Sequence, residues 1–487
     1  MRVISYSLLV VILASGCSIG LNGKDPVGHY VLAHKDGYPI DRERTPLRTE
    51  EYLNNYVNKI LAGIDQHVKK IQQKSPGESA RILIFIHGGL NTYKTGLERV
   101  QDLLKDQTGK VTSALFGDSS YYPIFINWNS SLYSSVYDDI FEIRQGSRNR
   151  WLGYVTSPFK ILARVAGGVA TAPLAWWYMG DNWLDSFRYP TEREKQLRST
   201  EGYINEEFLN RTWAWANWPA LLPVRVVTQP IVQSFGTPAW EMMKRRADLI
   251  LAKRLLPTDG HTDQGAAWIF LNEVKKRIPQ EKDGQLKRGM WQTSDGTKTP
   301  VRVEITLVGH SMGTMAIDRI LQAFPDIHFK RVVYLASASS IEDLERFVVP
   351  YLDENRDTEF WTISLFHTDE AGENEWYYFF VDRGSLLVWI DTFFENSLTS
   401  RQRRLGRYSN FEEYTHRRKT KDGQPISILK TELFPNADIT GMMLKGGKDD
   451  PKEHGDFSNR GVFKGIMCRL DPSAFRSHSC DGTNKDR

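Results

Sequence analysis

The chain has 487 residues, of which 40% are hydrophobic and 25% are charged, a composition that can fill a core and that excludes overall disorder. Its 63 basic and 59 acidic residues leave a formal net charge of +4, which gives no support to a nucleic-acid partner. The length allows several domains or one α/β domain enlarged by insertions.

Residues 1–17 are predicted to form the signal peptide of a lipoprotein. Arg2 precedes an apolar run from Leu8 to Leu13, and small residues lead up to Cys17, which is the order of a secretory signal. The apolar run is too short to span a bilayer. Small residues directly before a cysteine resemble the lipobox of bacterial lipoproteins, whose cysteine receives a diacylglycerol. An ordinary cleaved signal with an incidental cysteine is the alternative.

The same resemblance implies a location for the mature protein. Lipidation of Cys17 would anchor it to a membrane of the bacterial cell envelope. Ser18, in place of aspartate, resembles the signal for transport to the outer membrane, facing the periplasm. Residues 18–27 contain glycines and a proline and are expected to form a flexible tether.

The first elements of the folded part alternate between helix and strand. Apolar residues recur every three or four positions from 49 to 73, which predicts a helix with one buried face. The apolar run RILIFI at 81–86 predicts a buried strand, and a helical pattern at 95–106 leads to a second run, YPIFINW, at 122–128. This spacing fits a right-handed βαβ crossover.

Four further runs predict strands at 301–309, 331–337, 360–366 and 426–433. Helical patterns separate most of the six strands, and this alternation predicts an α/β fold with a doubly wound, mostly parallel sheet. The sheet and its helices would occupy residues 28–135 and 266–465, and residues 466–487 would form a polar tail.

Residues 136–265 are predicted to be a large helical insertion, because the gap before the strand at 301–309 is far longer than one crossover helix needs. Eight of the fourteen tryptophans lie in it, together with the apolar segment 161–179. An aromatic-rich insertion suits a lid over a lipidic site or an element at a membrane interface. A buried helix pair and a protein-docking surface are alternatives, whereas Arg164 and Pro173 disfavour a transmembrane helix.

The pentapeptide Gly309-His310-Ser311-Met312-Gly313 stands between a predicted strand and the helical pattern TMAIDRILQAF. A strand, a sharp turn and a helix in this order form a nucleophile elbow, in which a strained serine exposes its hydroxyl above the sheet. The flanking glycines leave room for the neighbouring strand and helix. Ser311 is therefore the predicted nucleophile, and an inert serine in a tight turn is the alternative.

A second motif, HGGLN at residues 87–91, directly follows the strand at 81–86. It matches an oxyanion loop, whose backbone N–H groups stabilise the charge of a tetrahedral intermediate by about 3–4 kcal/mol per donor. The expected donors are the amide of Gly89 or Leu90 and that of Met312. His87 and Asn91 are expected to brace the loop.

HGG after an early strand, with Gly88 at its centre, and GHSMG after a later one are similar to the motifs of the α/β-hydrolase superfamily. The likeness covers residues 80–135 and 300–460, and within the superfamily the chain is similar to bacterial serine esterases. This resemblance implies a catalytic triad and an acyl-enzyme mechanism, and it leaves the substrate open.

The resemblance also implies that a triad acid and then a histidine follow Ser311 in the chain. His454, in the polar loop DPKEHGDFSN, is the predicted base, because its context resembles that of many hydrolase histidines. Asp369, after the strand at 360–366, is the first choice for the acid, and Glu370 and Glu373 stay open. The acid would hold the imidazole in the correct tautomer.

The sequence contains no clustered metal ligands and no glycine-rich phosphate or dinucleotide loop, so neither a metal nor a cofactor is expected. Cys468 and Cys480 can form a disulfide in an oxidising periplasm, with two free thiols as the alternative. Together these features predict a membrane-anchored serine hydrolase that cleaves carboxylic esters, possible substrates being lipid or acyl esters. An inactive hydrolase-fold lipoprotein that acts as a scaffold or binding protein is the alternative.

Overall fold

The computed structural model describes most of the chain from Pro26 to Phe475. The described residues are 26–106, 108–117, 119–144, 147–188, 230–254, 264–281, 284–294, 300–365, 370, 373, 385–395, 397, 399–407, 410–411, 451 and 453–475.

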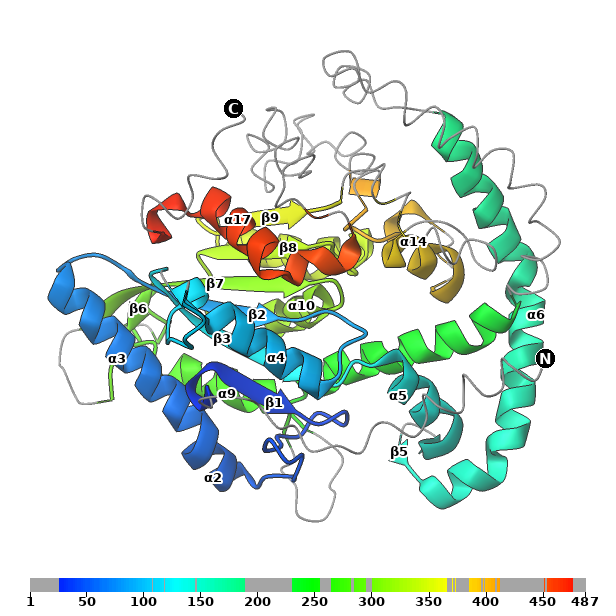
Figure 1. The fold of residues 1–487 in the computed structure, drawn as a ribbon, viewed down its shortest axis with the longest axis horizontal. Helices are drawn as coiled ribbons and strands as arrows, with labels where there is room; N and C mark the ends of the chain where they lie inside the picture. Colours follow the sequence, from blue (N-terminus) through cyan, green and yellow to red (C-terminus); the bar gives the residue numbers. More distant parts are fainter. Residues whose placement is uncertain are drawn as a thin grey trace.

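The core is a seven-stranded sheet in the order β1-β3-β2-β7-β8-β9, with β6 beside β7 (Figure 1). All neighbours on this path are parallel, and β6 pairs antiparallel with β7. The strands are β1 Tyr30–Ala33, β2 Ala80–Ile86, β3 Tyr121–Trp128, β6 Met290–Trp291, β7 Val301–His310, β8 Arg331–Leu335 and β9 Glu359–Ile363. Helices flank this sheet, so the α/β class with a mostly parallel sheet is confirmed.

Five of the six predicted strands are confirmed, as β2, β3, β7, β8 and β9. Their mostly apolar sequences suit strands that are covered on both faces, and all eight residues of β3 are buried. The sixth predicted strand, at 426–433, lies outside the described residues. Sequence patterns missed β1 and β6, which are only 4 and 2 residues long.

Two groups of helices cover the two faces of the sheet (Figure 1). α4 Tyr93–Leu104 and α17 Arg460–Leu470 lie on one face, where the rings of Phe85 in β2 and Phe463 in α17 are 5.1 Å apart. α3 Asn58–Lys74, α9 Ala266–Lys276 and α10 Gly313–Ala323 lie on the other. There, the Tyr122 side chain of β3 fills the space beside Gly63 of α3.

The helix predicted at 49–73 is confirmed as α2 Thr49–Tyr52, η2 Leu53–Val57 and α3. Shorter helical segments connect the remaining elements. They are η1 Val27–His29, η3 Leu115–Gly117, α11 Ile341–Asp343, η5 Leu344–Val348, α12 Val349–Glu354, α14 Leu386–Trp389, η7 Ile390–Phe394, η8 Ser400–Gln402, η10 His454–Ser458 and η11 Pro472–Ala474.

Between β3 and β7 the chain forms several helices beside the sheet. They begin with α5 Leu132–Tyr137 and η4 Asp138–Glu142, followed by the short strands β4 Ile143–Arg144 and β5 Ser147–Arg148. The long helix α6 Arg150–Arg188 runs along one side of the molecule, and a further helix covers residues 230–249 (Figure 1). No helix in the described part of the chain is both long and apolar enough to cross a bilayer.

The C-terminal segment differs from the polar tail predicted at 466–487. α17 continues through Leu470, η11 follows, and the side chains of Leu470 and Phe475 are buried. The prediction was wrong up to Phe475, because the apolar residues of α17 recur at helical spacing and pack into the core. Cys468 is disulfide-bonded, and its predicted partner Cys480 lies outside the described residues.

Candidate active site

Ser311 occupies a sharp turn between β7 and α10, at the carboxyl edge of the sheet. Its φ of +51° lies in the left-handed region that residues with a Cβ rarely adopt. A Cβ at Gly313 would lie 2.2 Å from the carbonyl oxygen of Ile86, and one at Gly309 would lie 2.8 Å from Ile317 Cδ1. The two glycines are therefore required for the close packing of this turn against β2 and α10.

His454, at the start of η10, reaches this turn from a distant part of the chain. Its Nε2 lies 2.7 Å from Ser311 Oγ, which is a normal hydrogen-bond distance. The His454 backbone is held on both sides, because its N–H donates to Glu373 Oε2 at 3.0 Å and its carbonyl lies 2.9 Å from His310 Nε2. The motif residue His310 therefore positions His454.

Burial sets the protonation state of this histidine. His454 is 6% exposed, and desolvation lowers the pKa of its imidazole to about 4. The ring is therefore neutral at neutral pH, and its Nε2 can accept the hydroxyl proton of Ser311. Within the described part of the chain, His454 Nδ1 is buried without a hydrogen-bond partner, so this nitrogen is left for an orienting acceptor.

Of the three acid candidates, Asp369 lies outside the described residues, whereas Glu370 and Glu373 are described. Glu373 contacts the backbone of His454, and burial raises the pKa of its carboxyl to about 7. Burial also raises the pKa of Glu370 to about 7, because desolvation outweighs the opposite effect of the nearby Arg407, which favours the ionised carboxylate. Glu370 accepts a hydrogen bond from Ser385 Oγ at 2.9 Å. Neither glutamate has a hydrogen bond to the His454 ring among the described contacts.

The predicted oxyanion loop passes directly beside Ser311. A Cβ at Gly88 would lie 2.8 Å from Ser311 Cβ, so only glycine permits this approach. The N–H of Leu90 donates to the carbonyl of Ser130 at 2.9 Å, and it is not free to bind an oxyanion. Among the hydrogen bonds of the described residues, none engages the backbone amides of Gly89 and Met312, which leaves these two as the available donors.

Side chains brace this loop as the sequence suggested. The N–H of Trp128 donates to His87 Nε2 at 3.1 Å, and this leaves His87 Nδ1 to donate to the carbonyl of Gly88 at 2.8 Å. Asn91 Nδ2 donates to the carbonyls of Gly88 and Gly89, both at 3.0 Å.

Ser130, which sequence analysis missed, adds a further brace to the loop. Its Oγ donates to the Gly88 carbonyl at 3.0 Å. No local pattern marks this serine, because it lies 42 residues from its partner.

The two side chains are nearly removed from solvent. Ser311 is 2% exposed and His454 is 6% exposed, so the hydroxyl and the imidazole meet in a desolvated site. Within the described residues, no group of three His, Cys, Asp or Glu side chains is arranged to hold a metal ion. The geometry thus brings a hydroxyl, an uncharged imidazole and two backbone amides together in a desolvated site.

Comparisons with known proteins add no independent identification. The chain matches no protein-family model, no curated protein and no solved structure.

Proposed function

We propose that the protein is a serine hydrolase of the α/β-hydrolase type, in which Ser311 is the nucleophile and His454 the general base. The observation that carries this proposal is the 2.7 Å contact between His454 Nε2 and Ser311 Oγ at a turn with a φ of +51°. An inert serine in a tight turn does not need an imidazole within hydrogen-bond distance, whereas acyl transfer does.

The proposed reaction proceeds through an acyl-enzyme. His454 Nε2 takes the hydroxyl proton as Ser311 Oγ attacks the ester carbonyl carbon. The oxyanion that forms faces the amides of Gly89 and Met312. The imidazolium then gives its proton to the leaving alcohol. Water, deprotonated by the same imidazole, attacks the acyl group and releases the carboxylic acid, and Ser311 recovers its proton.

The acid of the triad is proposed to be Asp369, because the contacts of the described glutamates favour other roles. Glu373 holds the backbone of His454 rather than its ring. Glu370 bonds Ser385 and lies near Arg407. A carboxylate beside His454 Nδ1 would fix the tautomer that leaves Nε2 free to accept a proton.

Esters with lipid or other long acyl chains are the proposed substrate class, and the surface of α6 supports it. Seven large apolar side chains lie exposed on this helix between residues 151 and 169. They are Trp151, Tyr154, Val155, Phe159, Leu162, Val165 and Val169. Lys160 and Arg164 turn away from them to pair with Asp139 at 2.8 and 2.9 Å. A helix that exposes aromatic and aliphatic side chains on an uncharged face suits the surface of a bilayer or micelle.

The proposal includes a lipid anchor at Cys17 in the bacterial cell envelope, and the location rests on the lipobox-like N-terminus alone. An inactive scaffold that uses the α6 surface to bind a partner is the competing function. The exposed apolar face favours this alternative as well, because apolar patches also mark protein interfaces.

Labelling with a fluorophosphonate probe separates the two functions. The purified protein is treated with the probe with and without detergent micelles, because the buried serine needs an open site. We expect labelling of the wild type and of Ser75→Ala, a serine at the end of α3, and no labelling of Ser311→Ala. Absence of wild-type labelling under both conditions would favour the scaffold.

A further inference from the structure

Arg246 is a buried cation on the helix over residues 230–249, and it points at the chain that follows β3. Its side chain is 1% exposed. Nη1 donates to the carbonyl of Asn129 at 3.1 Å and to Ser134 Oγ at 2.8 Å. Nη2 donates to Asp138 Oδ2 at 2.8 Å. One guanidinium thus binds three positions within ten residues of chain.

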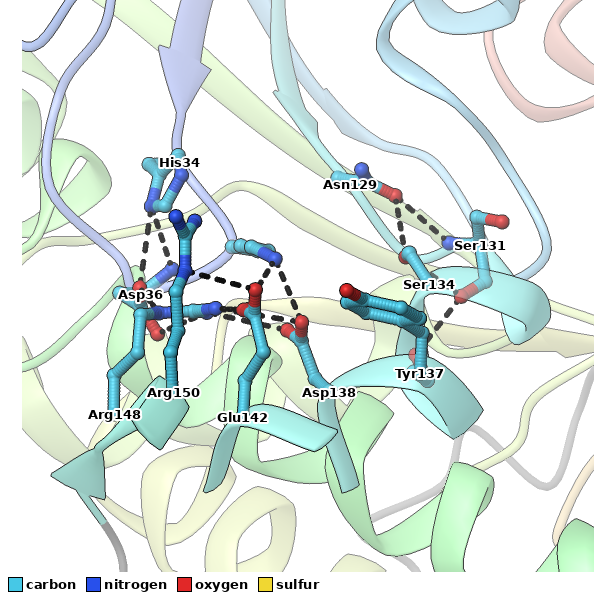
Figure 2. Close-up of polar contacts among 12 residues, drawn as sticks. His34, Asp36, Asn129, Ser131, Ser134, Tyr137, Asp138, Glu142, Arg148 and Arg150 are labelled. Atoms are coloured by element: carbon cyan, nitrogen blue, oxygen red, sulfur yellow. Dashed lines mark hydrogen bonds and ion pairs between the residues drawn. The ribbon is translucent and has the colours of Figure 1, made fainter. Parts of the chain in front are cut away.

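The charge of Asp138 does not by itself require Arg246. Figure 2 shows Asp138 and Glu142 facing Arg148 within a cluster of ionic side chains. Lys35 Nζ lies 2.6 Å from Asp138 Oδ1, and Arg148 Nη2 lies 3.2 Å from its Oδ2. Two other cations therefore compensate this carboxylate. The bonds that only Arg246 makes are those to Asn129 and Ser134, which fix the course of the backbone.

This backbone leads directly to the oxyanion loop. Figure 2 shows the Asn129 side chain turned towards Ser131 and Ser134, and its Oδ1 accepts the N–H of Ser131 at 3.1 Å. Ser130 lies between Asn129 and Ser131 in the chain, and its carbonyl accepts a hydrogen bond from the N–H of Leu90 at 2.9 Å. Its Oγ donates to the Gly88 carbonyl at 3.0 Å. A shift of Asn129 would therefore be passed on to the loop that carries the Gly89 amide.

The same helix also comes close to the loop itself. A Cβ at Gly89 would lie 3.8 Å from Met243 Sδ, so the Met243 side chain lies near the Gly89 backbone. Met243 and Arg246 are three residues apart and therefore share one face of the helix. Both side chains are buried.

We propose that Arg246 is a positioning residue, which holds the Gly89 amide in place for the oxyanion through Asn129 and Ser130. This inference rests on the proposed serine hydrolase function. Arginine suits the task because its planar fork donates in fixed directions to several acceptors at once. A lysine at this position would place one ammonium group near the same acceptors without fixing all three.

The test compares Arg246→Met and Arg246→Lys with the control Arg245→Met, which alters the adjacent arginine and its contact to Asp36 at 3.6 Å. We measure kcat and KM on a short p-nitrophenyl ester, and inhibition by a trifluoromethyl ketone whose hemiketal oxygen mimics the oxyanion. Arg246→Met should lower kcat roughly 10- to 100-fold with KM within about 2-fold, because small misplacements act mainly on the transition state. The inhibition constant of the trifluoromethyl ketone for Arg246→Met should rise by a similar factor. Arg246→Lys should recover part of kcat, and Arg245→Met should stay near the wild type.

If Arg246→Met fails to fold, Ser130→Ala gives a second test, because this variant keeps all the charged side chains around Asp138. It removes the hydroxyl bond to Gly88 and should lower kcat about 10-fold with KM unchanged. The inference is overturned if folded Arg246→Met, or Ser130→Ala in its place, keeps wild-type kcat and inhibition. A wild type that no fluorophosphonate labels would instead overturn the proposed function itself.

Discussion

The buried imidazole of His454 makes the stability of the protein depend on pH in a way that can be measured. In an unfolded chain a histidine titrates near 6.5, whereas burial lowers the pKa of His454 to about 4. As the pH falls below 6.5 the unfolded chain takes up a proton that the native site does not, so native stability is lost. The loss continues until the pH reaches about 4, where the native histidine also becomes protonated.

The size of this effect follows from the two pKa values. The difference between 6.5 and about 4 corresponds to about 3 kcal/mol at about 1.4 kcal/mol per pH unit. Gln in place of His454 keeps a side-chain nitrogen that can bond Ser311 Oγ, and it does not titrate. The free energy of unfolding of the wild type, minus that of His454→Gln, should therefore fall by about 3 kcal/mol between pH 7.5 and pH 4 where desolvation alone sets the pKa. The proposed Asp369 carboxylate at Nδ1 would raise the pKa of His454 and make the fall smaller.

Urea denaturation followed by tryptophan fluorescence measures both free energies at a series of pH values. The comparison cancels the titration of the other buried histidines, which is common to the two proteins. A difference that stays constant across this range would mean that His454 titrates normally in the native state. The description of the site as a desolvated, uncharged base would then be incorrect.

Three further predictions concern the loop, the acid and the surface. Gly88→Ala would place a Cβ 2.8 Å from Ser311 Cβ, and it should cost about 1–3 kcal/mol in urea denaturation and abolish most fluorophosphonate labelling. In ester assays Asp369→Asn should lower kcat roughly 10³- to 10⁴-fold, as loss of a triad acid does, whereas Glu373→Gln should lower kcat less than about 10-fold. If Glu373→Gln caused the larger loss of kcat, Glu373 rather than Asp369 would be the triad acid. Phe159→Ser removes an apolar side chain that is 75% exposed. This variant should co-sediment with phosphatidylcholine vesicles roughly 10-fold less than the wild type. Unchanged binding to the vesicles would argue against a lipid-facing α6.

The parts of the fold that sequence patterns predicted are those with strong local signals. The continuous apolar runs of β2 and β7 need burial on both faces, and only a sheet covered by helices supplies it. The glycines at 309 and 313 mark a tight turn in which a larger residue would clash, so the local sequence alone predicts Ser311 as the candidate nucleophile. β1 is buried throughout but has only four residues, YVLA, which is too short for a periodicity to appear.

The parts that could not be predicted depend on contacts between distant segments. His454 is predicted from the resemblance of its surroundings to those of hydrolase histidines, whereas its contact with Ser311 at 2.7 Å joins residues 143 positions apart. Ser130 and Arg246 have no such signal, because a single serine or arginine in a helix or loop is usually a surface residue. The sequence cannot distinguish the adjacent amides of Gly89 and Leu90 as oxyanion donors, because the difference lies in the bond from the Leu90 N–H to the distant Ser130 carbonyl.

The contacts of Arg246 also limit how an inserted lid could work. Arg246 and Asp138 are 1% and 2% exposed and form a charged pair. Moving the helix at 230–249 away from Asp138 would leave the buried Arg246 guanidinium without its carboxylate partner, which typically costs about 3–5 kcal/mol. Met243 on the same helix packs near Gly89. A rigid opening of the whole segment between β3 and β7 would move Arg246 and Asp138 together, but it would break the bonds that join Ser130 to Leu90 and Gly88 and would thus disrupt the oxyanion loop. Any movement that uncovers Ser311 is therefore expected to leave the helix at 230–249 in place and to occur elsewhere in the chain.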